Sequence, residues 1–306
     1  MATATVTERT SEAPRLRVLA RLREIAAYRE ILANLIRKEL KVKYTASVLG
    51  AVWSLLNPVV FLAVFTFVVR VLGNQTPHYP VFLLSGLLAW NLFSTGLTNG
   101  TRAVIDNANL VKKVAFPREI LPLATIGVAL VDFVLQSAVL LLFMLVTGYG
   151  FHLPALVLYP MAFVALLVFS TALVFWSSAL NVRYRDVGHL VGLAMLVWFW
   201  ATPIVYPGAL VQEKLSGKTF LGVDLWNAFL LNPLADIVFG FQRALYGTVS
   251  PEATVDGVTK PVPVLPDVSV AWLAGVLAIV IVASMLLLYL SWRLFFRRSG
   301  DFAEEL

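Results

Sequence analysis

The sequence contains no cysteine and only three histidines in 306 residues. The absence of cysteine excludes disulfides, thiolate metal sites and cysteine nucleophiles. The histidines, His78, His152 and His189, fall in three separate predicted loops. No HExxH or GxSxG motif occurs, and no carboxylates are paired at helical spacing within the apolar runs. We therefore predict no catalytic residue and no metal site, and expect that the chain is not an enzyme by itself.

Charge is also scarce, since charged residues make up 14% of the chain and hydrophobic residues 59%. Soluble domains carry about 25% charged residues, so this composition indicates a membrane protein. The net charge of +6 could suggest a nucleic-acid partner. However, the basic residues cluster beside apolar segments, as is typical of the cytoplasmic flanks of membrane helices. We expect contact with membrane lipids and no nucleic acid.

Long apolar runs are what the sequence has in abundance. Each run has roughly the 17–25 residues, or slightly more, that a helix needs to cross a ~30 Å hydrocarbon core. A helix satisfies its own backbone hydrogen bonds where water is absent. The fold class predicted is an all-α integral membrane protein with six transmembrane helices in a domain spanning residues 48–292. The six runs are Val48–Leu72, Tyr79–Leu97, Ile120–Val146, Leu153–Leu180, Val187–Val205 and Val270–Leu290.

The loops between these runs alternate in Lys and Arg content. The N-terminal arm, residues 102–118, residues 181–189 and the tail at 293–306 are basic, whereas residues 73–80 and 148–154 contain no Lys or Arg. Basic loops stay on the cytoplasmic side of a membrane. We therefore expect a multi-pass protein with both termini in the cytoplasm and a long outer loop from 206 to 269.

The segment before the first run divides into two parts. Residues 1–23 are predicted to form a disordered cytoplasmic arm. Residues 24–47 place apolar side chains at near-helical spacing, with basic residues on the other faces, so we predict an amphipathic interface helix that lies along the membrane.

Two features inside the apolar runs bear on function. Asp132 is the one acid well inside a spanning run, and a carboxylate is costly in lipid. We expect it to form a hydrogen bond with Gln136 or with a neighbouring helix; a proton relay is the alternative. Gly96 and Gly100 are four residues apart, as are Gly188 and Gly192, and such spacing permits a close approach of another helix.

The outer loop contains a second helical signal. Asn232 can cap a helix, Pro233 suits its first turn, and Gly247 can end it. This helix is too short to span the membrane, so with Leu225–Leu231 we predict a re-entrant hairpin within residues 206–247. Aromatic residues gather nearby. They form either an interfacial belt or a stacking surface for a polar, ring-shaped cargo.

Four stretches carry a resemblance to a known family. They are residues 35–58, which include Trp53, residues 109–119, residues 181–187 leading into 202–207, and residues 232–234. In this order they resemble the permease subunits of ATP-binding-cassette exporters for polysaccharides, O-antigens and teichoic acids. The resemblance implies six spanning helices, an amphipathic front helix and re-entrant helices before the last span.

The resemblance also implies partners. Two copies of the permease would pair as a homodimer in the bacterial cytoplasmic membrane, each bound to a cytoplasmic ATPase subunit. ATP and Mg would be held by that ATPase, with no cofactor on this chain. The cargo would be a lipid-linked polysaccharide or a teichoic-acid-like polymer moved outward.

Carried onto this sequence, the resemblance assigns roles to three sets of residues. A coupling helix at about 105–118 and two further cytoplasmic segments would contact the ATPase, through Arg37, Lys38, Lys41, Tyr44, Asn109, Lys112, Lys113, Phe116, Pro117, Arg118, Arg183, Tyr184, Arg185 and Asp186. The cargo channel would use Trp53, Trp90, Trp176, Trp198, Phe199, Trp200 and Tyr206. The outer gate would use Pro203, Pro207, Asn232 and Pro233.

Other functions remain open at this point. The same architecture could export a drug or a lipid. An integral membrane transferase for lipid-linked sugars would need acids that bind metal, and Asp106, Glu119 and Asp186 form no such set. An ion-coupled transporter would have Asp132 as its only candidate group.

Overall fold

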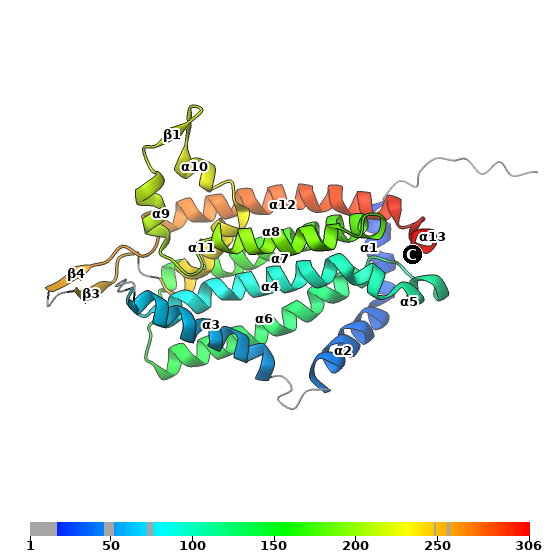
Figure 1. Cartoon of the computed structure of the whole chain (residues 1–306), viewed down its shortest axis with the longest axis horizontal. Helices are drawn as coiled ribbons and strands as arrows, with labels where there is room; N and C mark the ends of the chain where they lie inside the picture. The colour runs from blue at the N-terminus through cyan, green and yellow to red at the C-terminus, as the bar shows by residue number, and fades with distance from the viewer. Residues whose placement is uncertain (1–16, 46–51, 72–75, 248, 256–257) are drawn as a thin grey trace, which may run out of the picture.

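Four long helices lie side by side and form the body of the protein (Figure 1). In this computed structural model, which describes residues 17–45, 52–71, 76–247, 249–255 and 258–306, the chain is mostly helical. Helix α7 lies at the centre and packs against α4, α6 and α12. The four are α4 (Tyr79–Asp106), α6 (Ile120–Val146), α7 (Leu158–Arg183) and α12 (Val270–Arg298).

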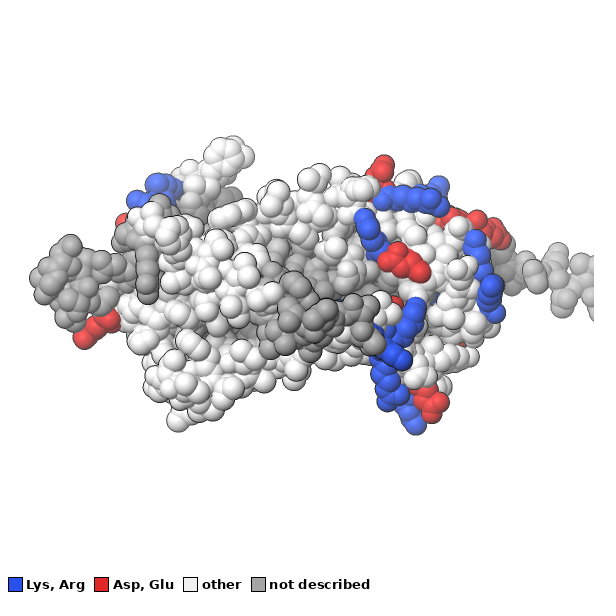
Figure 2. Space-filling model, turned by 60° about the horizontal axis from the view of Figure 1, so that its bottom comes forward, with Lys and Arg blue, Asp and Glu red and all other residues white. Residues whose placement is uncertain are grey.

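The surface of this bundle is apolar along most of its length. The charged side chains visible in Figure 2 gather at one end of the molecule, with a smaller group at the other end. The long helices have 26 to 29 residues, or about 39–44 Å at 1.5 Å per residue. All four are long and apolar enough to cross a membrane. The chain is therefore a multi-pass membrane protein.

Two shorter apolar helices flank the bundle. Helix α3 (Val52–Val71) packs against α4 and α6, and α8 (Val187–Trp200) packs against α4 and α7. The run predicted at Val187–Val205 thus ends earlier, at Trp200. The reason is Pro203, which disfavours helical backbone at the residue before it.

The N-terminal segment forms two helices, α1 (Val18–Ala27) and α2 (Arg29–Thr45), with a turn at Tyr28. Helical residues therefore begin inside the predicted disordered arm, 1–23, and the predicted helix 24–47 is divided. Residues 1–16 and 46–47 of these two segments lie outside the described residues. Helix α1 is ordered because Arg21 forms an ion pair with the body of the protein. Helix α2 packs along α6.

Helix α11 (Pro233–Leu245) begins and ends as the sequence predicts. The side chain of Asn232 accepts a hydrogen bond from the Leu234 backbone N–H at 3.2 Å, and Gly247 follows with a φ of +80°. The helix is buried nearly all round against α4, α7 and α12, including its polar residues Asp236 and Gln242. The remaining elements near this end of the molecule are η1 (Leu153–Ala155), α9 (Gly208–Leu215), β1 (Thr219–Phe220), β2 (Val223–Asp224), α10 (Leu225–Phe229), β3 (Glu252–Val255) and β4 (Val258–Pro261). Strands β1 and β2 pair antiparallel, as do β3 and β4.

At the opposite end lie α5 (Ala108–Lys113) and α13 (Phe302–Glu305). A separate hydrophobic cluster joins them to the ends of α2, α6 and α12, with Leu35, Val111, Ile120 and Phe295 among its members. The close approach predicted at the paired glycines is confirmed for Gly96 and Gly100 but not for Gly192, where an added Cβ would meet no atom within 4 Å. A Cβ added at Gly100 would lie 2.5 Å from a methyl group of Val174, so only glycine lets α7 pack this closely on α4.

Candidate functional site

Helix α5 presents the residues predicted to couple to a partner. It is a short helix of 6 residues between α4 and α6, within the predicted coupling segment 105–118. Asn109, Lys112 and Lys113 are exposed, while Phe116 is half-buried and Pro117 is buried. Exposed cations beside a half-buried aromatic ring suit a contact with a soluble protein.

The segment after α5 is fixed by a buried carboxylate. Glu119 is 0% exposed and accepts hydrogen bonds from Arg21 Nε and Nη2 at 2.8 and 2.7 Å, and from Trp292 Nε1 at 3.2 Å. Burial alone would lower the pKa of the Arg21 guanidinium, but its hydrogen bonds to Glu119 and the charge of that residue raise the pKa overall. One side chain thereby joins α1, α6 and α12.

Arg118, the last basic residue of the coupling segment, is half-buried. Burial lowers the pKa of its guanidinium, and the charges of Glu119 and Asp301 oppose this change. With Arg21 and Phe116 it lines a cleft of about 340 Å³ between α1, the coupling segment and the C-terminal end of α12. The cleft gives this end of the protein a concave, charged surface.

The turn between α7 and α8 lies at the same end of the molecule (Figure 1). The four predicted contact residues Arg183, Tyr184, Arg185 and Asp186 are all exposed. Asn181 holds the turn from inside, because its side chain donates to the Thr101 carbonyl and accepts from the Gly188 N–H, both at 2.9 Å. Arg102 lies against this turn, since a Cβ on Gly188 would be 3.5 Å from its Nε.

The predicted contact residues of α2 have two different environments. Arg37, Lys38 and Lys41 are exposed. Tyr44 instead donates to Asp132 Oδ1 at 2.7 Å, beside Lys43, whose Nζ lies 2.6 Å from Oδ2. A neighbouring helix, α2, thus supplies partners for Asp132, as predicted. Gln136 accepts a hydrogen bond from Asn91 at 2.8 Å.

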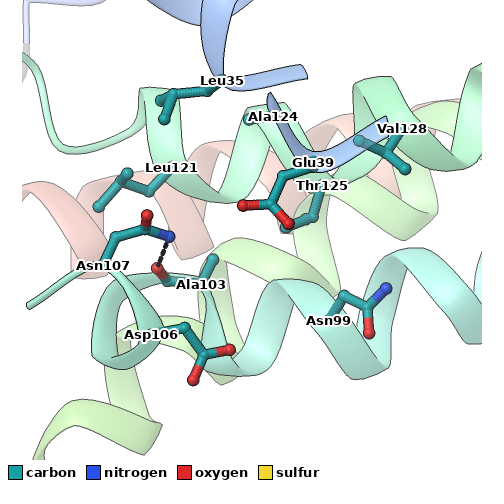
Figure 3. Close-up of a pocket in the computed structure, with 10 residues that line it drawn as sticks. All are labelled: Leu35, Glu39, Asn99, Ala103, Asp106, Asn107, Leu121, Ala124, Thr125 and Val128. Carbon is teal, nitrogen blue, oxygen red and sulfur yellow. Dashed lines mark hydrogen bonds between the residues drawn. The ribbon is translucent and has the colours of Figure 1, made fainter. Parts of the chain in front are cut away.

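A pocket of about 210 Å³ opens between α2, α4 and α6 (Figure 3). The carboxylates of Glu39 and Asp106 line it together with the amides of Asn99 and Asn107. Two carboxylates and no basic side chain make this pocket unsuitable for a phosphate group.

The predicted cargo aromatics divide into buried and exposed groups. Trp90 and Phe199 are each 8% exposed and pack edge-to-face, with ring centroids 5.2 Å apart. Trp176 and Trp200 are 45% and 56% exposed. The side chain of Trp53 lies outside the described residues. The exposed tryptophans are therefore the ones that a ligand or lipid can reach in this conformation.

Asn232 joins the end of α8 to the start of α11. Besides capping α11, its Oδ1 accepts from Trp198 Nε1 at 2.8 Å, and its Nδ2 donates to the Ala201 carbonyl at 3.2 Å. The Pro203 carbonyl accepts from Gln242 of α11 at 2.9 Å. The Tyr206 hydroxyl donates to the Trp200 carbonyl at 2.7 Å. The predicted gate residues Pro203 and Asn232 thus belong to one hydrogen-bonded junction together with Tyr206, a predicted cargo aromatic. The other two predicted gate residues flank helices: Pro207 precedes α9 and Pro233 starts α11.

Asp236, in the first turn of α11, is 1% exposed. Within the described part of the chain, neither of its carboxylate oxygens has a hydrogen-bond partner. The described residues contain no group of three or more His, Asp or Glu side chains that could hold a metal ion.

Comparison with known proteins identifies the family. A family model described as "ABC-2 type transporter" matches residues 31–214. The chain belongs to the ABC-2 type transporter family. The O-antigen export system permease protein RfbA of Myxococcus xanthus is 32% identical over 255 residues, 82% of this chain and 92% of that protein. The protein of the same name from Klebsiella pneumoniae is 31% identical over 214 residues, 70% of this chain and 79% of that protein.

The matched part of this ABC-2 permease runs from α2 to α9 and includes α5 and the turn between α7 and α8. Two features that sequence reasoning missed lie wholly or partly outside it. The first is the pair of Arg21, in α1, with Glu119. The only sequence signal for this pair was the position of Glu119 next to the predicted coupling segment. Asp236 was part of the predicted outer helix, and an acid among apolar residues was the available signal.

Proposed function

We propose that this ABC-2 permease is the transmembrane subunit of an ATP-driven exporter that moves a lipid-linked polysaccharide, of O-antigen or teichoic-acid type, out of the cytoplasm. The observation that carries the proposal is the position of α5: a short helix with exposed Lys112 and Lys113, which leads through residues 114–119 into α6. The start of α6 is held by the buried Glu119, which bonds to Arg21 and Trp292. The named relatives, which are permeases of O-antigen export systems, supply the substrate class.

The proposed topology has six membrane passes, with α3 and α8 added to the four long helices. Helix α3 has 20 residues, about 30 Å, which matches the hydrocarbon core. Helix α8 has 14 residues, about 21 Å, so the junction at Asn232 would lie within the membrane and α11 would be re-entrant. The basic ends of α5 and α12 would face the cytoplasm of a bacterial cell.

In the proposed assembly, two copies pair as a homodimer and each binds a cytoplasmic ATPase that holds ATP and Mg. Closure of the ATPases would push on α5. Because Glu119 bonds to both Arg21 and Trp292, such a push would move α1, α6 and α12 together. This is a route from ATP hydrolysis to helix motion.

The cargo would enter near the turn between α7 and α8. The exposed Arg183 and Arg185 lie there with Arg102, and guanidinium groups bind phosphate strongly. The acidic pocket of Figure 3 would repel a pyrophosphate, so we place entry on the α8 side. The sugars would then pass the exposed Trp200, with the junction at Asn232 as the outer gate.

The test is transport by the complete complex, with its ATPase, in lipid vesicles. Replacing both Lys112 and Lys113 with Ala, or Phe116 with Ala, should lower glycan-stimulated ATP hydrolysis and export while the permease still inserts and folds. Lys214 and Lys218 are matched controls, because they are equally exposed at the other end of the molecule. Unchanged coupling in the α5 variants, or transport by the permease without any ATPase, would refute the proposal.

A further inference from the structure

The three most buried carboxylates of the described chain differ in one respect. Glu119 and Asp132 are 0% and 7% exposed, and each is paired with a basic side chain. Asp236 is 1% exposed and has no such pair, and both of its oxygens lack a hydrogen-bond donor among the described residues. A buried polar group without a partner is rare in a folded protein and calls for a physical explanation.

The surroundings of Asp236 are apolar. It lines a cavity of about 220 Å³ between α7, α11 and α12, where its neighbours include Phe169, Val280 and Ser284. The titratable and charged residues on the elements packed against it are Tyr79, Arg102 and Asp106 of α4, Tyr159 and Arg183 of α7, Tyr289, Arg293, Arg297 and Arg298 of α12, and Arg243 of α11 itself.

An ionised carboxylate in such a place is strongly disfavoured, because no basic side chain of the described residues pairs with it and no described group donates a hydrogen bond to it. The two oxygens are also inaccessible to water while α11 is packed. A proton can bind to such a carboxylate, because it requires no cavity around the two oxygens. Helix α11 in turn is joined to the end of α8 through Asn232 and Gln242, so any movement of the junction would move Asp236.

We propose that Asp236 is a proton-binding site that stabilises the packed position of α11. The carboxyl is neutral while α11 packs against α7 and α12. When α11 moves away and water reaches the carboxyl, its proton passes to water, and the proton returns from water when α11 packs again. The inference rests on the proposed role of this junction as the outer gate.

The direction of the pH effect follows from this scheme. The packed state binds one proton more than the open state, so a rise in pH favours the open state. The ratio of open to packed molecules can rise by at most about tenfold per pH unit while Asp236 titrates. Below the ordinary pKa of an aspartate the effect disappears, because both states are then protonated.

The absence of cysteine allows a direct test with the full chain in lipid vesicles. Ala244, on α11, is 0% exposed, and Ser216, on the outer loop, is exposed. Each is replaced in turn by Cys and treated with a maleimide from about pH 5 to about pH 9. The rate at Ser216→Cys corrects for thiol ionisation. The corrected rate at Ala244→Cys should rise with pH in the parent chain.

The variant Asp236→Asn cannot titrate, so its corrected rate should not change with pH. Asp267→Asn removes an exposed acid of the outer region and should keep the parent profile. If Asp236→Asn folds poorly, Asp236→Glu is used instead. In that variant the corrected labelling rate should still rise with pH, with its midpoint at a different pH. A pH-independent parent, a slope that persists in Asp236→Asn, or a rate that follows sodium at fixed pH would overturn the proposal. No glycan or ATP is present, so this failure would leave the export function untouched.

Discussion

Arg21 and Glu119 lie 98 positions apart in the sequence and form a two-pronged ion pair in the structure. The side chain of Arg21 is 17% exposed and that of Glu119 is 0% exposed. The ring of Phe296 on α12 covers the Arg21 guanidinium, whose centre lies 5.0 Å from the ring centroid. Three segments at this end of the protein therefore depend on one carboxylate.

Arg21→Ala should destabilise the protein by about 3–5 kcal/mol, because it leaves the buried charge of Glu119 without its cation. The double variant Arg21→Ala, Glu119→Gln should lose less than the sum of the two single variants, since no buried charge remains. Thermal unfolding of the detergent-solubilised protein measures both. Additive losses would show that the pair is not energetically coupled. Arg23→Ala is the control, because Arg23 is exposed on the same helix.

A second prediction concerns Asp132. Its partners Lys43 and Tyr44 belong to α2, so we expect a structural role and no role in ion coupling. Lys43→Met should destabilise the chain more than the double variant Lys43→Met, Asp132→Asn, which leaves no unpaired charge. Asp132→Asn should retain ATP-driven export. Loss of export in a well-folded Asp132→Asn protein would instead support the proton-relay alternative.

The sequence allowed the apolar helices and the capped helix after Asn232 to be predicted, because both depend on local patterns. It did not indicate which faces of the helices pack together. In a membrane protein, lipid is as apolar as the core, so the hydropathy of a helix does not distinguish its buried face from its lipid face. Trp90 and Trp200 illustrate this: one is buried in the protein and the other is half exposed.

Long-range polar pairs were also beyond the sequence. Arg21 was one of several arginines in a basic arm, and nothing local marked it as the partner of Glu119. Likewise, Tyr44 was predicted to contact a partner protein, yet it bonds to Asp132 of this chain. Such pairings depend on how α1 and α2 lie against α6, and that arrangement is a property of the whole fold.

A third prediction concerns alkaline pH. The Tyr149 hydroxyl donates to the Tyr246 carbonyl at 2.6 Å, and burial raises the pKa of Tyr149 to about 12. Above about pH 10 the unfolded tyrosine ionises while the folded one stays protonated, so the folded state binds more protons and stability falls as pH rises towards 12. Tyr149→Phe should cost about 1 kcal/mol at neutral pH and lose less stability above pH 10. Parallel losses in both proteins, measured by thermal unfolding, would contradict this.

The last prediction separates the two functions of Asn232. Its Oδ1 caps α11 and accepts from Trp198, whereas its Nδ2 donates to the end of α8. Asn232→Asp keeps the acceptor and loses the donor, while Asn232→Ala loses both. Loss of a cap costs about 1 kcal/mol and a buried hydrogen bond about as much, so Asn232→Ala should destabilise by roughly 2 kcal/mol and Asn232→Asp by less. If the junction is the outer gate, both variants should also raise the corrected labelling rate at Ala244→Cys.

The control is Asn227→Ala, on the exposed face of α10, which should change neither the stability nor the labelling rate. If the two Asn232 variants are equally stable, the Oδ1 acceptor contributes nothing to stability and the prediction is wrong.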